Sequence, residues 1–383
     1  ERPSAPTPVS TPPAASTETR DLARCPLELR VYDLEANAGA PSAPFATGDG
    51  VAVVYTRVTN GAAERVLHRV DARGTLLPPR SLGTTAVSMA APSVVVQGGA
   101  LSFPFANAGR VFLQTFDLPS GVARADAPPT MLRGYPSELT VGPRGVFLAY
   151  SSAPDWLALV RDAGRDEIEL EVRLTAPSVS FEPPAQALAS GARVDVALVP
   201  RRIRAELLTL ALDAVVLAPG DVRPVARFEL ARDRNGVQSG VAAGAHGFLV
   251  AWSVAPFDQL SLERFDLAGA RASAPPPLRG VAPDRVLRYP RVAPLGAGWA
   301  LSYWDGTSPV VQRLDDAGGP LGAPVEVRSG DERGGHTDAR MLATDDALWI
   351  SWTVGEPART HGLPGEAPAH PGPRLAVARC LQR

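Results

Sequence analysis

The sequence contains no lysine, so all 38 of its basic residues are arginine. This usage indicates the codon bias of a GC-rich bacterial genome. Acidic residues number 40 and the formal net charge is -2, so the chain lacks the basic excess that binding to a phosphate backbone requires. We therefore expect no nucleic-acid partner. No run of about 18 apolar residues occurs, which excludes a transmembrane helix.

Cysteine is equally scarce, with only Cys25 and Cys380 in 383 residues. Two isolated cysteines cannot form a zinc site alone, whereas a pair predicts a disulfide and an oxidising compartment. We expect a secreted, periplasmic or cell-surface protein. Motifs for a nucleophile elbow, a phosphate-binding loop or a zinc protease are also missing, so catalysis is uncertain and the sequence favours a protein that is not an enzyme.

Continuous helical periodicity is hard to find, whereas 39 prolines and 35 glycines are spread along the chain. Hydrophobic residues make up 45% of the sequence, which is ample for a core. The pattern predicts many short strands and turns. Residues 1–24 are rich in Pro, Ser and Thr, which predicts an extended tether. A lipid anchor upstream of this sequence is one hypothesis for how the protein is attached. Residues 25–383 form the predicted folded domain.

A short motif recurs along this domain, in which glycine precedes alternating bulky residues and a closing aromatic, as in "GWALSY". A degenerate copy, "AELLTL", fills one double gap. The copies end at positions 55, 103, 150, 210, 252, 303 and 352, giving steps of 48, 47, 60, 42, 51 and 49 residues. Seven copies with a mean spacing near fifty residues indicate a repeat protein.

Each copy is followed by a strand-like run that ends on Asp and then Gly, as in "RVDARG" from Arg69 and "RFDLAG" from Arg264. Asp caps a tight turn and Gly accepts positive φ, so these aspartates are interpreted as turn formers. Four short antiparallel strands in about fifty residues are typical of a propeller blade. We predict an all-β, seven-bladed β-propeller; six blades plus an insertion is the alternative, because the fourth unit lacks the aromatic and the Asp-Gly turn.

The two ends of the chain complete the predicted ring. The last unit has three strands, near "DARMLAT", "ALWISW" and "RLAVARC", whereas "CPLELRVYD" from Cys25 has no blade of its own. We expect this N-terminal run to supply the missing outer strand, with Cys25 opposite Cys380. A disulfide there closes a loop of about 355 residues and contributes about 4 to 5 kcal/mol in the chain-entropy model.

The unit "GxxLAW" followed by "RxDxxGxxL" resembles the repeats of uncharacterised secreted β-propeller proteins of myxobacteria and related GC-rich bacteria. The resemblance covers residues 25–383 and implies blade architecture, but it implies no activity. The Asp-box of sialidases, the repeated Trp-Asp pairs of WD propellers and calcium-binding Asp repeats are all absent from this sequence.

Three of the five histidines lie within 35 residues of one another in the last unit: His336, His361 and His370. Their loops are expected on one face of the ring, with Asp331, Glu332 or Asp338 nearby. Imidazole and carboxylate are transition-metal ligands, so a metal site there is one hypothesis, with solvated histidines and no cofactor as the alternative.

Aromatic residues in loops on the same face are candidate binding residues. Trp304 follows Tyr303 in the strand and must face the other way, whereas Trp156 and Phe257 fall in loops between second and third strands. Such rings stack on sugars or anchor protein partners. His361 and His370 join this predicted binding set through their long loop.

These features predict an extracytoplasmic binding or scaffolding propeller of the bacterial cell envelope. Its partner is expected to be an envelope protein or a polysaccharide, contacted through face loops. A hydrolase or lyase acting on polysaccharide is the alternative, and a structural subunit of an envelope assembly is a third hypothesis.

Overall fold

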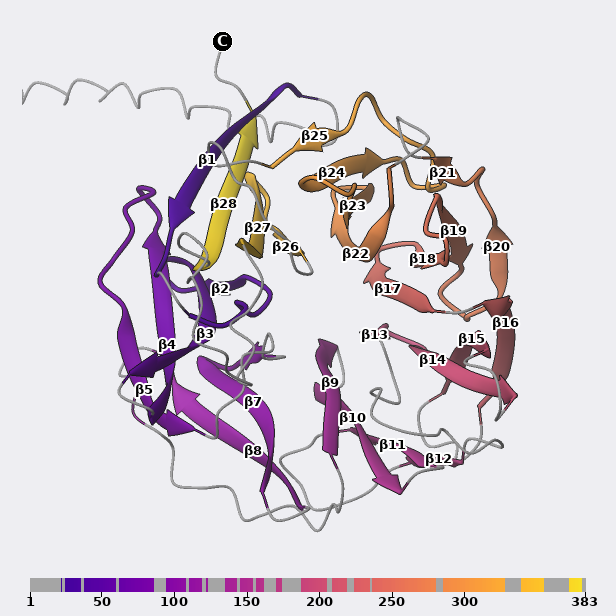
Figure 1. Cartoon of the computed structure of the whole chain (residues 1–383), viewed down its shortest axis with the longest axis horizontal. Helices are drawn as coiled ribbons and strands as arrows, with labels where there is room; N and C mark the ends of the chain where they lie inside the picture. Colours follow the sequence, from indigo (N-terminus) through magenta and orange to yellow (C-terminus); the bar gives the residue numbers. More distant parts are fainter. Residues whose placement is uncertain are drawn as a thin grey trace, which may run out of the picture.

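The computed structural model shows an all-β protein in which antiparallel sheets are arranged around a common centre (Figure 1). This arrangement is a β-propeller. No helix long and apolar enough to cross a membrane is found in the described part of the chain. The structure describes residues 22, 25–35, 38–59, 62–85, 94–107, 110–118, 122, 135–142, 145–153, 156–161, 170–173, 187–204, 209–218, 224–234, 236–279, 285–327, 339–354 and 372–380.

The described strands form seven sheets, numbered here in chain order. Sheet 1 consists of β2 (Phe45–Thr47), β3 (Gly50–Thr59), β4 (Ala62–Asp71) and β5 (Arg80–Thr85). Sheet 2 consists of β6 (Val95–Gln97), β7 (Ala100–Asn107) and β8 (Arg110–Asp117). Sheet 3 consists of β9 (Tyr135–Gly142), β10 (Gly145–Ala153), β11 (Trp156–Arg161) and β12 (Leu170–Arg173). Sheet 4 consists of β13 (Ala187–Ser190), β14 (Asp195–Arg204), β15 (Thr209–Leu217) and β16 (Ala226–Arg234).

The three remaining sheets lie in the C-terminal half. Sheet 5 consists of β17 (Val237–Gly244), β18 (Gly247–Val254), β19 (Gln259–Phe265), β20 (Arg271–Ser273) and β21 (Leu278–Arg279), which also pairs with β19. Sheet 6 consists of β22 (Arg288–Leu295), β23 (Gly298–Trp304), β24 (Pro309–Leu314) and β25 (Val325–Glu326). Sheet 7 consists of β26 (Arg340–Ala343), β27 (Ala347–Val354), β28 (Gly372–Cys380) and the N-terminal β1 (Leu27–Asp33).

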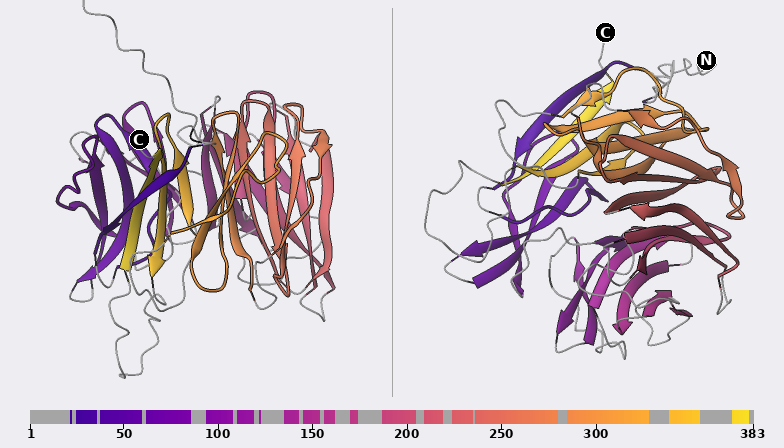
Figure 2. Two further views of the ribbon diagram at one scale, coloured as in Figure 1. Left: turned by 90° about the horizontal axis from the view of Figure 1, so that it is seen from above. Right: turned by 45° about the vertical axis from the view of Figure 1, so that its right-hand side comes forward.

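The first strand of each sheet lies nearest the centre, and the following strands lie progressively outwards (Figure 1). The strands run between two faces of a thick disc (Figure 2). One face carries the links between second and third strands, including residues 255–258 and 305–308; we call it the connection face. Because the strands are antiparallel, links from one sheet to the innermost strand of the next also reach this face.

The N-terminal strand closes the ring as predicted. β1 pairs antiparallel with β28 as the outermost strand of sheet 7, in a register that runs from Leu27 opposite Cys380 to Asp33 opposite Arg374. Cys25 and Cys380 form a disulfide with a Cα–Cα distance of 5.5 Å. Sheet 6 holds the same segment, because Nη1 of Arg313 donates to the carbonyl oxygens of Leu22 at 3.1 Å and Cys25 at 2.5 Å.

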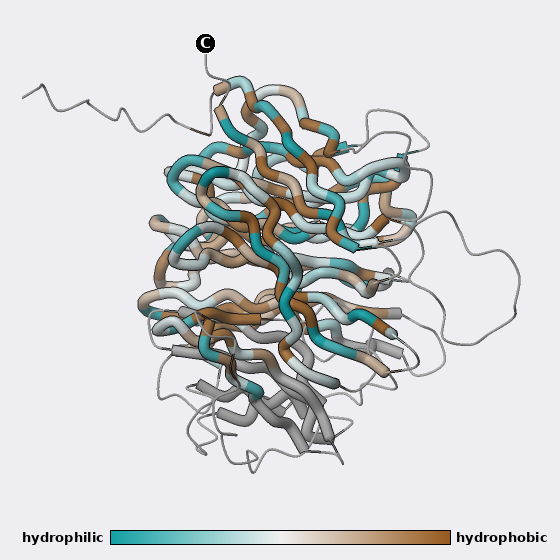
Figure 3. The backbone as a smooth tube through the Cα atoms, turned by 90° about the vertical axis from the view of Figure 1, so that its left-hand side faces the viewer, coloured by the Kyte–Doolittle hydropathy of each residue, from teal (hydrophilic) through white to brown (hydrophobic). Residues whose placement is uncertain are grey.

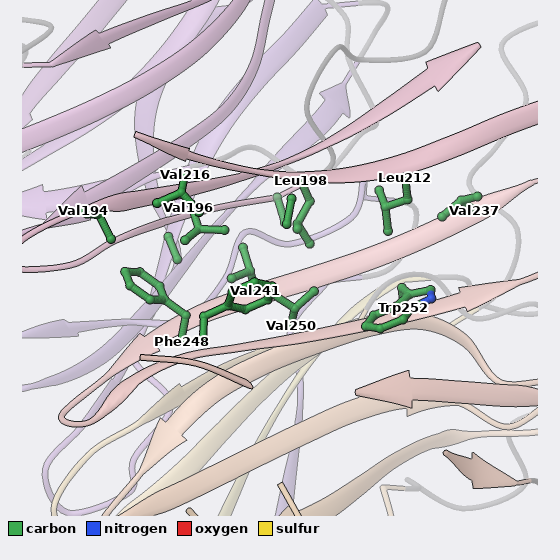
Figure 4. Close-up of a cluster of buried hydrophobic side chains, with 14 residues drawn as sticks. Val194, Val196, Leu198, Leu212, Val216, Val237, Val241, Phe248, Val250 and Trp252 are labelled. Carbon is green, nitrogen blue, oxygen red and sulfur yellow. The ribbon is translucent and has the colours of Figure 1, made fainter. Parts of the chain in front are cut away.

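Hydrophobic side chains fill the space between neighbouring sheets. Figure 4 shows valine and leucine side chains of sheet 4 facing Val241, Phe248 and Trp252 of sheet 5 in one cluster. Similar clusters join sheets 5 and 6, 6 and 7, 7 and 1, and 1 and 2. Hydrophobic residues follow the strands through the disc (Figure 3). Successive residues of a second strand face opposite neighbours: Val51 and Val53 pack toward sheet 7, whereas Ala52 and Val54 pack toward sheet 2. Burial stabilises each side chain by about 1.5 to 3 kcal/mol.

The fourth copy of the repeat was placed wrongly by the sequence pattern. Leu210 lies in β15, the third strand of sheet 4, and the second strand is β14, which pairs with β13 on one side and β15 on the other. Asp195 stands there in place of the usual glycine, and Pro200 in place of the aromatic. The first residues of the second strands are evenly spaced, 45 to 52 residues apart, at positions 50, 100, 145, 195, 247, 298 and 347.

The Asp-Gly turns have the predicted chemistry in sheets 1, 5 and 6. Asp266 Oδ1 accepts hydrogen bonds from the backbone N–H groups of Ala268 at 2.8 Å and Ala270 at 2.9 Å. Gly269 has φ of 79°, and an added Cβ would lie 2.4 Å from Val216 of sheet 4. The turn therefore needs glycine both for its backbone and for its packing on the preceding sheet.

Candidate functional site

The histidines of the predicted metal site, His336, His361 and His370, lie outside the described residues. The same holds for their candidate partners Asp331, Glu332 and Asp338. In the described part of the chain, no group of three or more His, Cys, Asp or Glu side chains is arranged to hold a metal. The metal hypothesis and the binding role of the two later histidines stay predictions.

The three aromatic residues of the predicted binding set belong to different sheets. Trp156 begins β11 in sheet 3, where it pairs with Arg173. Phe257 lies between β18 and β19 in sheet 5, and Trp304 ends β23 in sheet 6. Sheets 5 and 6 are neighbours, so Phe257 and Trp304 lie at one junction on the connection face, whereas Trp156 lies two sheets away from Phe257.

Phe257 is held in an unusual backbone conformation. Its φ is 67°, which lies in a region that bulky residues rarely adopt. This conformation costs roughly 1 to 3 kcal/mol, so it persists only where the surroundings fix it. Here the N–H of Phe257 donates to the Val254 carbonyl at 2.7 Å, and its carbonyl accepts the N–H of Leu287 at 2.6 Å. The second bond ties the loop of sheet 5 to the segment that leads into sheet 6.

Tyr289 is the second non-glycine residue with positive φ among the described residues, at 54°. The register of β22 against β23 shifts between Arg288 and Arg291, so Tyr289 lies in a bulge of the innermost strand. Its N–H donates to Oε1 of Gln238, in the innermost strand of sheet 5, at 2.8 Å. Bulges re-aim side chains and are common beside binding and active sites.

Arg288 links these residues. Its guanidinium carbon lies 4.8 Å from the centroid of the Phe257 ring, which is a cation–π contact. Arg288 also pairs with Trp304 across the ladder of β22 and β23. Trp304 is half-buried, and its indole N–H is buried with no acceptor in the described structure, so another edge of the ring faces the surface.

The polar side chains next to these residues bond to one another. Nη1 of Arg285 bonds Asp305 Oδ2 at 2.9 Å and also contacts Thr307 Oγ1. Burial tends to raise the pKa of Asp305, but hydrogen bonds from Ser308 and Thr307 and the charge of Arg285 outweigh burial and hold its pKa below the usual value. Asp305 is therefore ionised and paired, which suits a structural role better than proton transfer.

We call Phe257, Arg288, Tyr289 and Trp304 the aromatic–arginine site. It combines the stacked Phe257 ring and Arg288 guanidinium with Trp304, which pairs with Arg288, and Tyr289, on a backbone fixed by hydrogen bonds between two sheets. Sequence reasoning found Phe257 and Trp304 but missed Arg288 and Tyr289, which lie in the innermost strand β22. The signal that could have found them is an aromatic residue before proline between two arginines.

A second polar cluster lies between sheets 7 and 1. The Tyr55 hydroxyl donates to Glu35 Oε2 at 2.9 Å and lies 3.2 Å from Nδ1 of His68, whose side chain is buried. Burial raises the pKa of Tyr55, and the hydrogen bond to Glu35 adds to this effect. Burial lowers the pKa of His68, although a backbone hydrogen bond to Leu77 and the charge of Glu35 oppose it.

Because buried His68 is neutral in the folded protein, we expect the stability of the fold to decrease in mild acid. The folded-state pKa of His68 lies below its unfolded value of about 6.5, so stability is fully present above that value and falls as pH decreases through it. We expect the melting temperature of the wild type to decrease between pH 7.5 and pH 5, and His68→Gln to decrease less. Equal pH dependence in both proteins would contradict this role of His68.

The sequence matches no protein-family model and no curated protein sequence. It is similar in structure to the β-propeller domain of the trilobed protease from Pyrococcus furiosus, with a TM-score of 0.49, 13% identity and 83% of this chain aligned to 92% of that one. It is also similar to a prolyl endopeptidase, with a TM-score of 0.48, 15% identity and 83% of this chain aligned.

The protein spans 46% of the prolyl endopeptidase chain. A third similar structure is the Dos1 propeller, with a TM-score of 0.47, 12% identity, and 86% of this chain aligned to 75% of that one. These structural similarities describe the fold alone, and they do not support any particular function.

Proposed function

We propose that the protein is a seven-bladed β-propeller, exported to the bacterial cell envelope, that binds its partner through the connection face. Seven sheets among the described residues, each in contact with the next, support the blade number. The disulfide between Cys25 and Cys380 supports an oxidising compartment, since such bonds persist outside the reducing cytosol.

The observation that carries the binding role is the aromatic–arginine site. Two positive-φ residues, Phe257 and Tyr289, come from different sheets and are each fixed by hydrogen bonds across the junction. A strained backbone at a surface of fixed aromatic rings is typical of a preorganised binding site. Phe257, Tyr289 and Trp304 are half-buried, so less side-chain entropy is lost when a ligand stacks on them than for fully exposed rings.

A polysaccharide fits this surface better than an apolar protein interface does. The large hydrophobic residues exposed in the described part of the chain are Val58 in β3, Val122 after β8 and Val225 before β16, so they belong to different parts of the ring. Stable assembly interfaces need a contiguous apolar patch. Sugars are instead bound by aromatic faces together with polar planar side chains, which the aromatic–arginine site provides.

The innermost strands do not favour a glycoside hydrolase. Their charged residues in the described structure are Glu138, Arg288, Arg291 and Arg340. Hydrolysis of glycosides generally needs a pair of carboxylates that face the same bond. One carboxylate on a strand of a distant sheet does not provide that pair, so we propose binding without catalysis.

The test is native gel electrophoresis in gels that contain one of a panel of neutral and acidic polysaccharides. We expect at least one polysaccharide to retard the protein, and we expect Phe257→Ala and Trp304→Ala to weaken this binding at least tenfold. Val225→Ala, which removes an exposed apolar side chain far from the site, is the matched control and is expected to bind normally. Melting temperatures establish that each variant is folded.

Two results would overturn the proposed function. One is that no polysaccharide in the panel retards the folded wild-type protein. The other is that Phe257→Ala and Trp304→Ala bind as tightly as Val225→Ala, which would place the binding surface elsewhere on the ring.

A further inference from the structure

Arg288 carries a positive charge that no described residue neutralises. Its contact with the Phe257 ring is a stacking contact at 4.8 Å, and its guanidinium forms no ion pair or hydrogen bond with the described residues. Its Nε is buried without an acceptor, whereas its terminal nitrogens are not among the buried unpartnered polar atoms. The terminal edge of the guanidinium therefore faces solvent.

The stacked arginines of this protein differ in how their charge is paired. Arg30 and Arg65 lie over the rings of Tyr32 and Phe103 without an ion pair to a described carboxylate. Arg271 stacks on the Phe228 ring at 5.1 Å in the same manner, but its Nε also bonds Glu263 at 2.5 Å. Arg227 bonds the buried Asp213 at 3.0 Å. A stacked arginine without a carboxylate partner is thus not unique to Arg288, which differs from Arg30 and Arg65 in its position beside Phe257 and Trp304 on the connection face.

Two carboxylates lie in connection-face loops near Arg288: Asp258 is exposed and follows Phe257, whereas Asp305 is already occupied. Asp305 follows Trp304 in the chain and pairs with Arg285 at 2.9 Å, while the N–H groups of Thr307 and Ser308 each donate to its other oxygen at 3.0 Å. Arg285 is therefore neutralised and Arg288 is not, although Arg288 lies only three positions further along the chain. Arg288 is thus a cation that is available to a ligand on this face.

We propose that the aromatic–arginine site binds the carboxylate of an acidic sugar, a uronic acid residue of a polysaccharide. This inference rests on the proposed function and specifies its ligand. Arg288 holds the carboxylate through its terminal nitrogens, because a planar guanidinium matches a carboxylate with two parallel hydrogen bonds. Phe257 fixes the plane of the guanidinium, and Tyr289 and Trp304 supply rings for the sugar.

The test compares ligands that differ only in charge. Isothermal titration calorimetry is carried out with oligogalacturonate and with oligoglucuronate, each alongside its methyl ester. We expect one uronate to bind at least tenfold more tightly than its ester, because the ester cannot form the charge-assisted pair with Arg288. We expect that affinity to decrease as salt increases.

A matched pair of variants separates contact from long-range attraction. Arg288→Gln and Arg285→Gln remove the same charge from positions three residues apart. We expect Arg288→Gln to weaken uronate binding at least tenfold and Arg285→Gln to weaken it less than threefold. Equal losses in the two variants would overturn the inference, since the effect would then be one of net charge.

Further outcomes separate this inference from the proposed function. Equal binding of uronate and ester, or binding of neutral polysaccharides alone, would overturn the acidic-sugar ligand and leave polysaccharide binding intact. Absence of binding by both uronates would also overturn it. Binding of oligoglutamate as tightly as uronate would replace the sugar with an acidic peptide.

Discussion

Replacement of both cysteines, in Cys25→Ser/Cys380→Ser, is expected to lower the free energy of unfolding by about 5 kcal/mol. The disulfide spans 355 residues, so it constrains almost the whole unfolded chain. It also joins the two strands that close the ring, β1 and β28. The total stability of a domain is about 5 to 15 kcal/mol, so the loss is a large fraction of it.

Guanidinium denaturation of the oxidised wild type, the reduced wild type and the double variant measures this loss. The reduced wild type is the matched control, because it keeps both cysteines and lacks only the bond. We expect the reduced protein and the variant to unfold at similar, lower midpoints. Hydrogen exchange should also speed up in β1 (Leu27–Asp33) before it does in β3 (Gly50–Thr59), because β1 is the outermost strand. Unchanged midpoints would show that the disulfide is not needed for closure.

Gly247→Ala is expected to destabilise the protein by about 3 kcal/mol. Gly247 begins the second strand of sheet 5 with φ of 140°, and an added Cβ would lie 2.0 Å from the carbonyl oxygen of Phe265 in the third strand. That oxygen belongs to the backbone of a buried strand and cannot move aside cheaply. A clash of this kind combines backbone strain and overpacking, each of which costs about 1 to 3 kcal/mol.

The neighbouring repeats provide the comparison. At Gly298, which begins the second strand of sheet 6, an added Cβ would lie 2.3 Å from the Leu314 carbonyl oxygen, so Gly298→Ala should cost a similar amount. Ala100 occupies this position in sheet 2, and Ala100→Gly should cost only about 1 kcal/mol. Thermal and denaturant unfolding measure all three. A cost for Gly247→Ala below that of Ala100→Gly would contradict this reason for the glycine in the repeat.

The same contact explains why the blades could be found from sequence. In sheets 1, 5 and 6, glycine begins the second strand because a carbonyl oxygen of the third strand lies too close for a side chain, and the aromatic five residues later is buried. Tyr55, Phe103, Trp252, Tyr303 and Trp352 all lie in second strands, and each is buried. Cysteine placement and strand count likewise predicted the closing pair correctly.

The fourth sheet shows where this reasoning fails. Both β14 and β15 consist largely of buried aliphatic residues, so a hydrophobic pattern cannot distinguish the second strand from the third. Because the fourth unit has neither the glycine nor the aromatic, the repeat was assigned to the hydrophobic run that ends at Leu210. That run belongs to the third strand of sheet 4 and not to the second. The order of the strands follows from the pairing of Asp195 with Ser190 in β13 and with Leu217 in β15. The composition of one segment does not show which strands pair.

The candidate site was predictable only in part. Phe257 and Trp304 could be named because loop and strand positions follow from the repeat. Arg288 could not be assigned, since its contact with Phe257 joins residues of different sheets across the junction. The bulge that displaces Tyr289 depends on the partner strand β23, and the network of Glu35, Tyr55 and His68 depends on how the N-terminal segment crosses to sheet 1.

A crystal structure of the protein grown with the tighter-binding oligouronate tests the central claim most directly. We expect seven sheets closed by β1, with a sugar carboxylate on the terminal nitrogens of Arg288 and a sugar ring beside Phe257, Tyr289 or Trp304. Six sheets with an accessory element, or a sugar bound away from the junction of sheets 5 and 6, would contradict it.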